Sequence, residues 1–138
     1  MLKNVYHTLL KNPKHMFFVD GLGALISAFF LGVPMVHFNE YIGIPIRALY
    51  GLATLALVFL VYDLFCLFFL KEGQSKYLYI IAGVNMGYCL LSVGVAIFHR
   101  SSLTFWAWLY IIVEIVLISF IVNLEIKLAK QINSNKAY

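Results

Sequence analysis

The sequence predicts an all-α membrane protein built as a bundle of four transmembrane helices. Of its 138 residues, 63% are hydrophobic and only 12% are charged. A soluble domain of this composition would lack polar surface. Four apolar stretches each approach the roughly 20 residues that cross a hydrocarbon core of about 30 Å. Backbone groups in lipid need partners within the segment, so these stretches are expected to be helices in one domain, 1–138.

Residues 1–11 are predicted to form a short amphipathic helix at the membrane interface. Leu2, Val5 and Leu9 share one face at helical spacing, and lysines occupy the other face. A basic segment before an apolar stretch is also typical of a signal peptide. Because this stretch contains Asp20 and lacks a small-x-small cleavage site, we interpret it as a retained span.

Turn and capping residues divide the rest of the chain. The Asn-Pro pair at 12–13 is a typical helix start, and Pro45 is well placed to begin a second helix. Pro34 is expected to kink or end the first span near its far end. The predicted spans are 13–36, 46–70, 76–98 and 103–127, and they are followed by a polar tail at 129–138 whose end is expected to be disordered.

The distribution of basic residues predicts the orientation. Only Arg47 and Arg100 flank the spans on one side, whereas eight lysines lie on the other. The positive-inside rule then places both termini in the cytoplasm, in a plasma membrane or a bacterial inner membrane. The net charge of +4 reflects this topology and attraction to anionic lipid. The sequence has no clustered basic and aromatic surface for nucleic acid.

Small residues mark the helix faces where another helix can approach closely. Gly83 and Gly87 form a G-x-x-x-G pair in the third span, Gly94 follows one heptad later, and Gly23 lies in the first span. Such a face is suited to a homodimer or a larger membrane complex. It serves contacts within one chain equally well.

Three acidic residues fall well inside the predicted spans, namely Asp20, Asp63 and Glu114. Each costs roughly 2.5–3.5 kcal/mol at the membrane centre on insertion scales. No lysine or arginine lies in the interior of a span to neutralise them, and Glu114 has no obvious partner. The carboxyl groups are therefore expected to be protonated, hydrogen-bonded, hydrated or paired with a bound cation.

The polar residues of the spans are expected to converge in one layer. Reflecting the second and third spans about their turn puts Asp63 level with Asn85, as a polar pair, with Asp20 in the same layer and Glu114 one or two turns deeper. A structural alternative is that Asp63 and Asn85 only clasp the hairpin, and that Asp20 reaches lipid headgroups. The candidate ligand- or proton-binding residues are Glu114, Asp63, Asp20, Asn85, Tyr62, Tyr88, Cys89, Ser92, Ser27 and Tyr110.

Cysteine and histidine give little indication of a cofactor, and none is expected. Cys66 and Cys89 fall at different depths, so a disulfide between them is not expected. His37 and His99 end the first and third spans on the same side. They are weak candidates for a metal site, because interfacial histidines are more often not ligands.

The favoured function is binding or translocation of a small cationic or amphipathic solute, or of protons, through an acidic pocket in the bilayer. A second hypothesis is a non-catalytic membrane subunit or assembly factor whose polar residues specify helix packing. A small membrane enzyme using paired carboxylates ranks third. Because the sequence has no recognisable nucleophile or phosphate-binding loop, an enzyme is the less favoured class.

Overall fold

The computed structural model describes residues 1–137, and all of their regular secondary structure is helical, as predicted. Four segments are long and apolar enough to cross a membrane by length and composition, at 14–37, 46–69, 74–98 and 105–136. The helices are α1 (Leu2–Lys11), α2 (Lys14–Gly32), α3 (Pro34–His37), α4 (Asn39–Ile42), α5 (Ile46–Phe69), α6 (Gln74–Phe98) and α7 (Phe105–Lys136).

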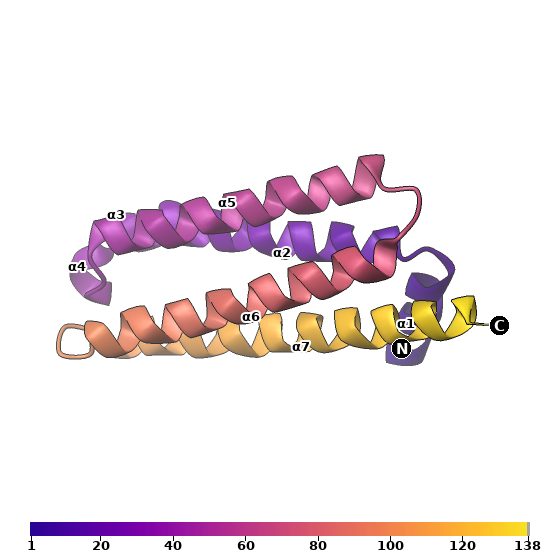
Figure 1. Cartoon of the computed structure of the whole chain (residues 1–138). Helices are drawn as coiled ribbons and strands as arrows, with labels where there is room; N and C mark the ends of the chain where they lie inside the picture. Colours follow the sequence, from indigo (N-terminus) through magenta and orange to yellow (C-terminus); the bar gives the residue numbers. More distant parts are fainter. Residues whose placement is uncertain (138) are drawn as a thin grey trace.

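The long helices form two antiparallel pairs, α2 with α5 and α6 with α7 (Figure 1). Contacts within each pair are extensive, whereas contacts between the pairs are sparse. Both chain ends and the turn between α5 and α6 lie at one end of the bundle, and α1 packs there against the end of α7 (Figure 1). The two hairpins therefore meet face to face, and the space between them is where a site can form.

Proline ends the first long helix, as the sequence predicts. Helix α2 stops at Gly32, Val33 leaves the helical region with φ −121° and ψ −75°, and Pro34 begins the short helix α3. The proline ring lacks an N–H and clashes with the preceding turn, so the helix cannot continue unbroken through this position.

Helix α7 extends to Lys136, beyond the end expected at residue 127. Leu128 and Ala129 are fully buried against the N-terminal part of the chain, and the Tyr6 hydroxyl donates a hydrogen bond to Gln131. These contacts stabilise the helix in a segment that is predicted from its composition to be a polar tail. The expected disorder of the chain end falls partly on Tyr138, which lies outside the described residues.

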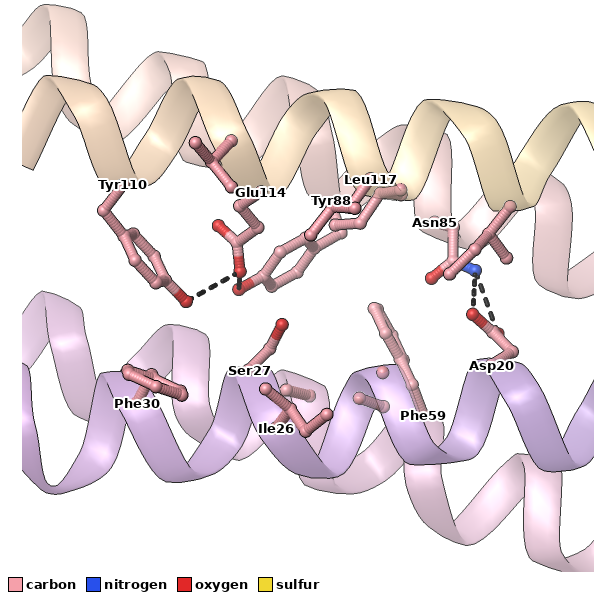
Figure 2. Close-up of a pocket in the computed structure, with 16 residues that line it drawn as sticks. Asp20, Ile26, Ser27, Phe30, Phe59, Asn85, Tyr88, Tyr110, Glu114 and Leu117 are labelled. Atoms are coloured by element: carbon pink, nitrogen blue, oxygen red, sulfur yellow. Dashed lines mark hydrogen bonds between the residues drawn. The ribbon is translucent and has the colours of Figure 1, made fainter.

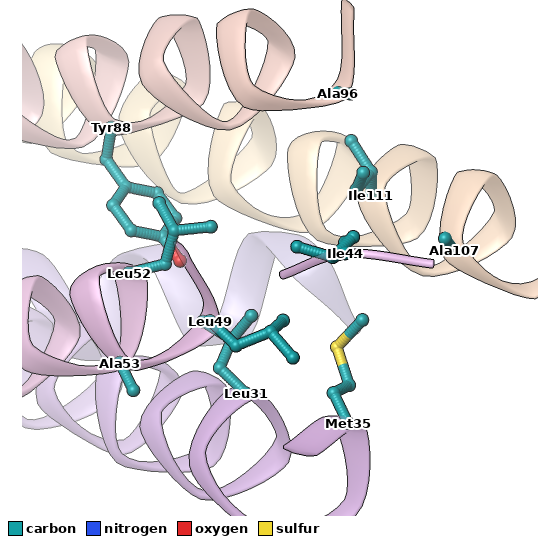
Figure 3. Packing of buried hydrophobic residues seen from close by; sticks show 10 residues of the cluster. All are labelled: Leu31, Met35, Ile44, Leu49, Leu52, Ala53, Tyr88, Ala96, Ala107 and Ile111. Atoms are coloured by element: carbon teal, nitrogen blue, oxygen red, sulfur yellow. The ribbon is translucent and has the colours of Figure 1, made fainter. Parts of the chain in front are cut away.

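Two hydrophobic clusters fill the two ends of the bundle. The cluster near the α3 end includes Leu31, Leu49 and Ile111 (Figure 3). The other, near the chain termini, includes Phe17 and Leu128. Along α2 and α7 the polar buried residues lie between these two clusters. The polar layer therefore interrupts a core that is apolar on either side of it.

Large apolar side chains cover the outside of the bundle. Phe68, Phe69 and Leu90 are each about 70% exposed, and the exposed apolar positions are spread over all four long helices. Such a surface is unfavourable in water and suits contact with hydrocarbon.

Candidate functional site

A cavity of about 380 Å³ lies between α2 and α7, with side chains of α5 and α6 completing its wall (Figure 2). Its volume falls within the range of roughly 300–1,000 Å³ that is typical of small-molecule sites. Most of the lining is aliphatic or aromatic. The polar side chains that reach it are Asp20, Ser27, Asn85, Tyr88, Tyr110 and Glu114.

Small residues leave room for the cavity. Gly23 and Ala24 line it from α2, and Ala56 lines it from α5. A Cβ atom added at Gly23 would meet Ile121 of α7 at 3.6 Å, an ordinary van der Waals distance, so α7 lies near α2 beside the cavity.

Glu114 lies at one end of the cavity and is hydrogen-bonded on one side only. The hydroxyl groups of Tyr88 and Tyr110 both donate to its Oε1 atom, each at 3.2 Å. Figure 2 shows the Ser27 hydroxyl pointing across the cavity toward the same group. Glu114 is therefore not unpartnered, contrary to the sequence-based expectation. Tyr88 and Tyr110 are among the residues predicted to bind, but the sequence did not identify them as the partners of Glu114.

Asp20 and Asn85 form the polar group at the other end of the cavity. The Asn85 amide nitrogen lies 3.0 Å from each carboxyl oxygen of Asp20 and donates to that group (Figure 2). Both residues are buried, with 5% and 6% of their surface exposed. The contact joins α2 to α6, and therefore one helix pair to the other.

The expected pairing of Asp63 with Asn85 is wrong. Asp63 is fully buried, and neither of its carboxyl oxygens has a hydrogen-bond partner among the described residues. Although α5 and α6 are consecutive, they contact each other little, because each packs against a different helix. The reflection assumed a tight hairpin at this turn, so it assigned Asn85 to the wrong carboxyl group.

Glu125 is a buried acid that the sequence reasoning missed. It is fully buried, and neither carboxyl oxygen has a hydrogen-bond partner in the described chain. The fourth predicted span ends at residue 127, only two residues after Glu125, and this acid was not counted with Asp20, Asp63 and Glu114. Glu125 follows Glu114 by eleven residues, which is close to three helical turns, so both acids lie on one face of α7. This spacing is the signal in the sequence that could have identified Glu125 as a buried acid.

Two further carboxyl groups lie near Asp20 on the terminus side of the cavity. Asp63 and Glu125 are both neighbours of the Asp20 carboxyl group. Gly21 makes room for this arrangement, because a Cβ atom there would lie 3.2 Å from the Cβ of Asp63. We call Asp20, Asp63 and Glu125 the carboxyl cluster. Asp20 belongs both to the cluster and to the cavity wall.

Three other predicted site residues lie outside the cavity wall. Tyr62 donates a hydrogen bond to the backbone carbonyl of Tyr77. Cys89 and Ser92 are buried on α6, and the Ser92 hydroxyl has no partner among the described residues. The structure thus brings together six of the ten predicted binding residues around one cavity.

The histidines at the α3 end of the bundle make local contacts. A ring nitrogen of His99 lies 3.0 Å from the Val95 carbonyl, and the His37 ring packs edge-on against Phe38. Within residues 1–137, no three or more histidine, cysteine, aspartate or glutamate side chains are placed to hold a metal ion.

The three glycines of α6 face outward. A Cβ atom added at Gly83, Gly87 or Gly94 would meet no atom of the described chain within 4 Å. These positions therefore make no close helix contact among residues 1–137, in contrast to Gly21. The predicted close contact with another chain remains a prediction.

The cavity is open sideways, between α2 and α7. Ile26 and Phe30 on α2, and Val113 and Leu117 on α7, line the cavity and are each about half exposed. The opening therefore faces the same surface as the other exposed apolar side chains.

Comparison with protein-family models, with curated proteins and with solved structures finds no match to this chain. The interpretation of the cavity therefore depends on its own residues.

Proposed function

We propose that this chain is an integral membrane protein that binds a small amphipathic molecule with a cationic, hydrogen-bond-donating group. One observation carries this proposal: an apolar cavity contains the carboxyl group of Glu114 and opens toward the apolar outer surface of the bundle. A ligand dissolved in the bilayer could enter between α2 and α7 without crossing water.

The lining matches a ligand with two chemically different parts. Phe30 and Phe59 offer aromatic surface for an apolar body. The tyrosine hydroxyls hold Oε1 of Glu114, which leaves Oε2 to accept a hydrogen bond from an ammonium group. In a site of low dielectric constant, such a charge-assisted hydrogen bond is stronger than it is in water.

The orientation follows from charge. We place the end of the bundle that carries both termini in the cytoplasm, because the lysines of the flanking segments gather there and only Arg47 and Arg100 lie at the other end. The membrane is then a plasma membrane or a bacterial inner membrane. The hydrophobic clusters at both ends of the bundle favour binding from the bilayer over a continuous path across it.

Matched ligands test the proposal. We expect 4-phenylbutylamine to bind the protein in lipid nanodiscs, and 4-phenylbutan-1-ol, which is similar in size but uncharged, to bind at least tenfold more weakly. Glu114→Gln should weaken amine binding by about 10- to 100-fold, since a hydrogen bond to a charged group contributes about 1.5–3 kcal/mol. Glu40→Gln, an exposed acid, serves as the matched control. Equal binding of the amine to the wild-type protein and to Glu114→Gln contradicts the proposal.

A second candidate function is that of an assembly subunit, and the outward glycines of α6 favour it. Gly83, Gly87 and Gly94 expose backbone on one helix without a neighbour in the described chain, and close helix contacts in membranes use such surfaces. Gly87→Leu should then dissociate a homodimer or larger complex while amine binding persists. A sedimentation profile that is the same for Gly87→Leu and wild type removes this candidate.

A further inference from the structure

The carboxyl cluster has a chemical requirement that the cavity does not explain. Asp20 is flanked by Asp63 and Glu125, and all three carboxyl groups are buried. All four oxygens of Asp63 and Glu125 lack hydrogen-bond partners in the described chain, and both side chains are fully buried. Two carboxylates in contact repel each other, whereas a proton between them converts the contact into a hydrogen bond.

The groups around the cluster offer no other neutralising charge. Helix α6 contributes the uncharged Asn85, and α2 and α7 contribute only Asp20 and Glu125 of the cluster itself. Helix α5 adds Tyr62 and Cys66 beside Asp63, and neither of these is a cation. No lysine or arginine of residues 1–137 takes part in these contacts. In the described part of the chain, these three acids are not grouped as the ligands of one metal ion.

We propose that Asp20, Asp63 and Glu125 form a proton-binding site that holds two protons, one on Asp63 and one on Glu125, with Asp20 as the shared carboxylate. Each protonated side chain donates a hydrogen bond to Asp20, and Asn85 donates a third. The carboxyl groups of Asp63 and Glu125 are then each hydrogen-bonded to Asp20. The cluster keeps a single negative charge, on Asp20.

This arrangement presents that charge to the cavity. Asp20 lines the cavity wall, whereas Asp63 and Glu125 lie outside the lining. Glu114 is a separate group, about 16 Å from Glu125 along the axis of α7. A cationic ligand that reaches Asp20 would therefore favour the state with two protons over the state in which Asp20 is also protonated. This effect of a cationic ligand on the protonation of Asp20 rests on the proposed function, whereas the proton site itself does not.

Selective labelling gives a test that needs no variant. Asp20 and Asp63 are the only aspartates in the chain. In protein labelled with ¹³C at the aspartate side-chain carboxyl and held in nanodiscs at neutral pH, we expect one resonance from a protonated carboxyl group and one from a carboxylate. Two carboxylate resonances, or two protonated ones, overturn the assignment.

Variants then assign the signals. Asp63→Asn should remove the protonated aspartate resonance, and it keeps an amide donor toward Asp20. With labelled glutamate, Glu125→Gln should remove a protonated resonance that Glu114→Gln leaves in place. A glutamate spectrum in which Glu125→Gln removes a carboxylate overturns the proposal.

The same samples separate this inference from the proposed function. Added 4-phenylbutylamine should shift the Asp20 carboxylate resonance while that of Asp63 stays protonated. If the amine binds nowhere and the aspartate pair still shows one protonated and one ionised group, the proposed ligand is wrong and the proton site stands. If the amine binds and both aspartates are carboxylates, the proton site is wrong and the ligand site stands.

Discussion

The amide nitrogen of Asn85 lies 3.0 Å from both carboxyl oxygens of Asp20, and this contact connects the two helix pairs at mid-bundle. The α2/α5 pair and the α6/α7 pair share few other contacts in the middle of the bundle, because the cavity occupies that space. The Asp20–Asn85 contact therefore closes one end of the cavity and fixes one hairpin relative to the other.

We expect Asn85→Ala to destabilise the protein by about 1–3 kcal/mol, because it leaves the buried Asp20 carboxyl group without its amide donor. Reversible unfolding in mixed detergent micelles measures this change. Asn123→Ala is the matched control, since Asn123 is exposed and bonds only to the Ser119 carbonyl of its own helix. Equal unfolding curves for the two variants would show that the Asp20–Asn85 contact contributes nothing to stability.

The contributions of Tyr88 and Tyr110 to stability should be coupled, because both hydroxyl groups donate to Glu114. Tyr88→Phe and Tyr110→Phe each remove one of two donors to the same oxygen, at an expected cost of about 1 kcal/mol in unfolding free energy. The double variant should cost more than the sum of the single variants, because the carboxyl group then keeps neither donor. Tyr50→Phe, at an exposed position, is the control. Strict additivity would indicate that the two hydroxyls do not share Glu114.

Much of this structure could be predicted from composition and periodicity. Hydropathy located the four long helices, except for the last nine residues of α7, and Pro34 marked the break after α2. These features depend on local chemistry, on segment length and on the geometry of the proline ring, so a single sequence carries them.

The pairing of helices could not be predicted in the same way. The sequence gives depth along each helix, but it does not say which helix packs against which. Asp63 was therefore paired wrongly with Asn85, and Glu114 was left without a partner, although both residues are buried polar groups. Glu125 was missed because a charged residue near the end of a span usually reaches water. Only the packing of Leu128 and α1 beyond it shows that the burial continues.

Glycine positions distinguish contacts within the chain from open surface. Gly21→Ala would place a Cβ atom 3.2 Å from the Cβ of Asp63, so we expect a loss of about 1–3 kcal/mol from overpacking and a displaced carboxyl cluster. In Gly87→Ala the added Cβ atom meets no atom of the described chain within 4 Å, so the monomer should be as stable as the wild type or slightly more stable.

Thermal unfolding of Gly21→Ala and Gly87→Ala at equal detergent concentration tests both expectations. A Gly21→Ala protein as stable as Gly87→Ala would contradict the close approach of α2 and α5 at Asp63.

Filling the cavity should weaken binding while every acidic residue is kept. Ser27 lies on α2 and lines the cavity opposite Glu114 (Figure 2), so the larger side chain in Ser27→Leu would occupy the space that a ligand needs. We expect amine binding to fall by at least tenfold. We expect stability to stay within about 1 kcal/mol of the wild type, because an apolar group replaces empty space among apolar neighbours.

Binding of 4-phenylbutylamine in nanodiscs, measured together with the unfolding midpoint, gives both quantities. Ser101→Leu, in the exposed turn between α6 and α7, controls for added hydrophobicity. Undiminished binding to Ser27→Leu would mean that the amine binds elsewhere on the bundle, and the decrease caused by Glu114→Gln would then need an explanation other than a ligand inside the cavity.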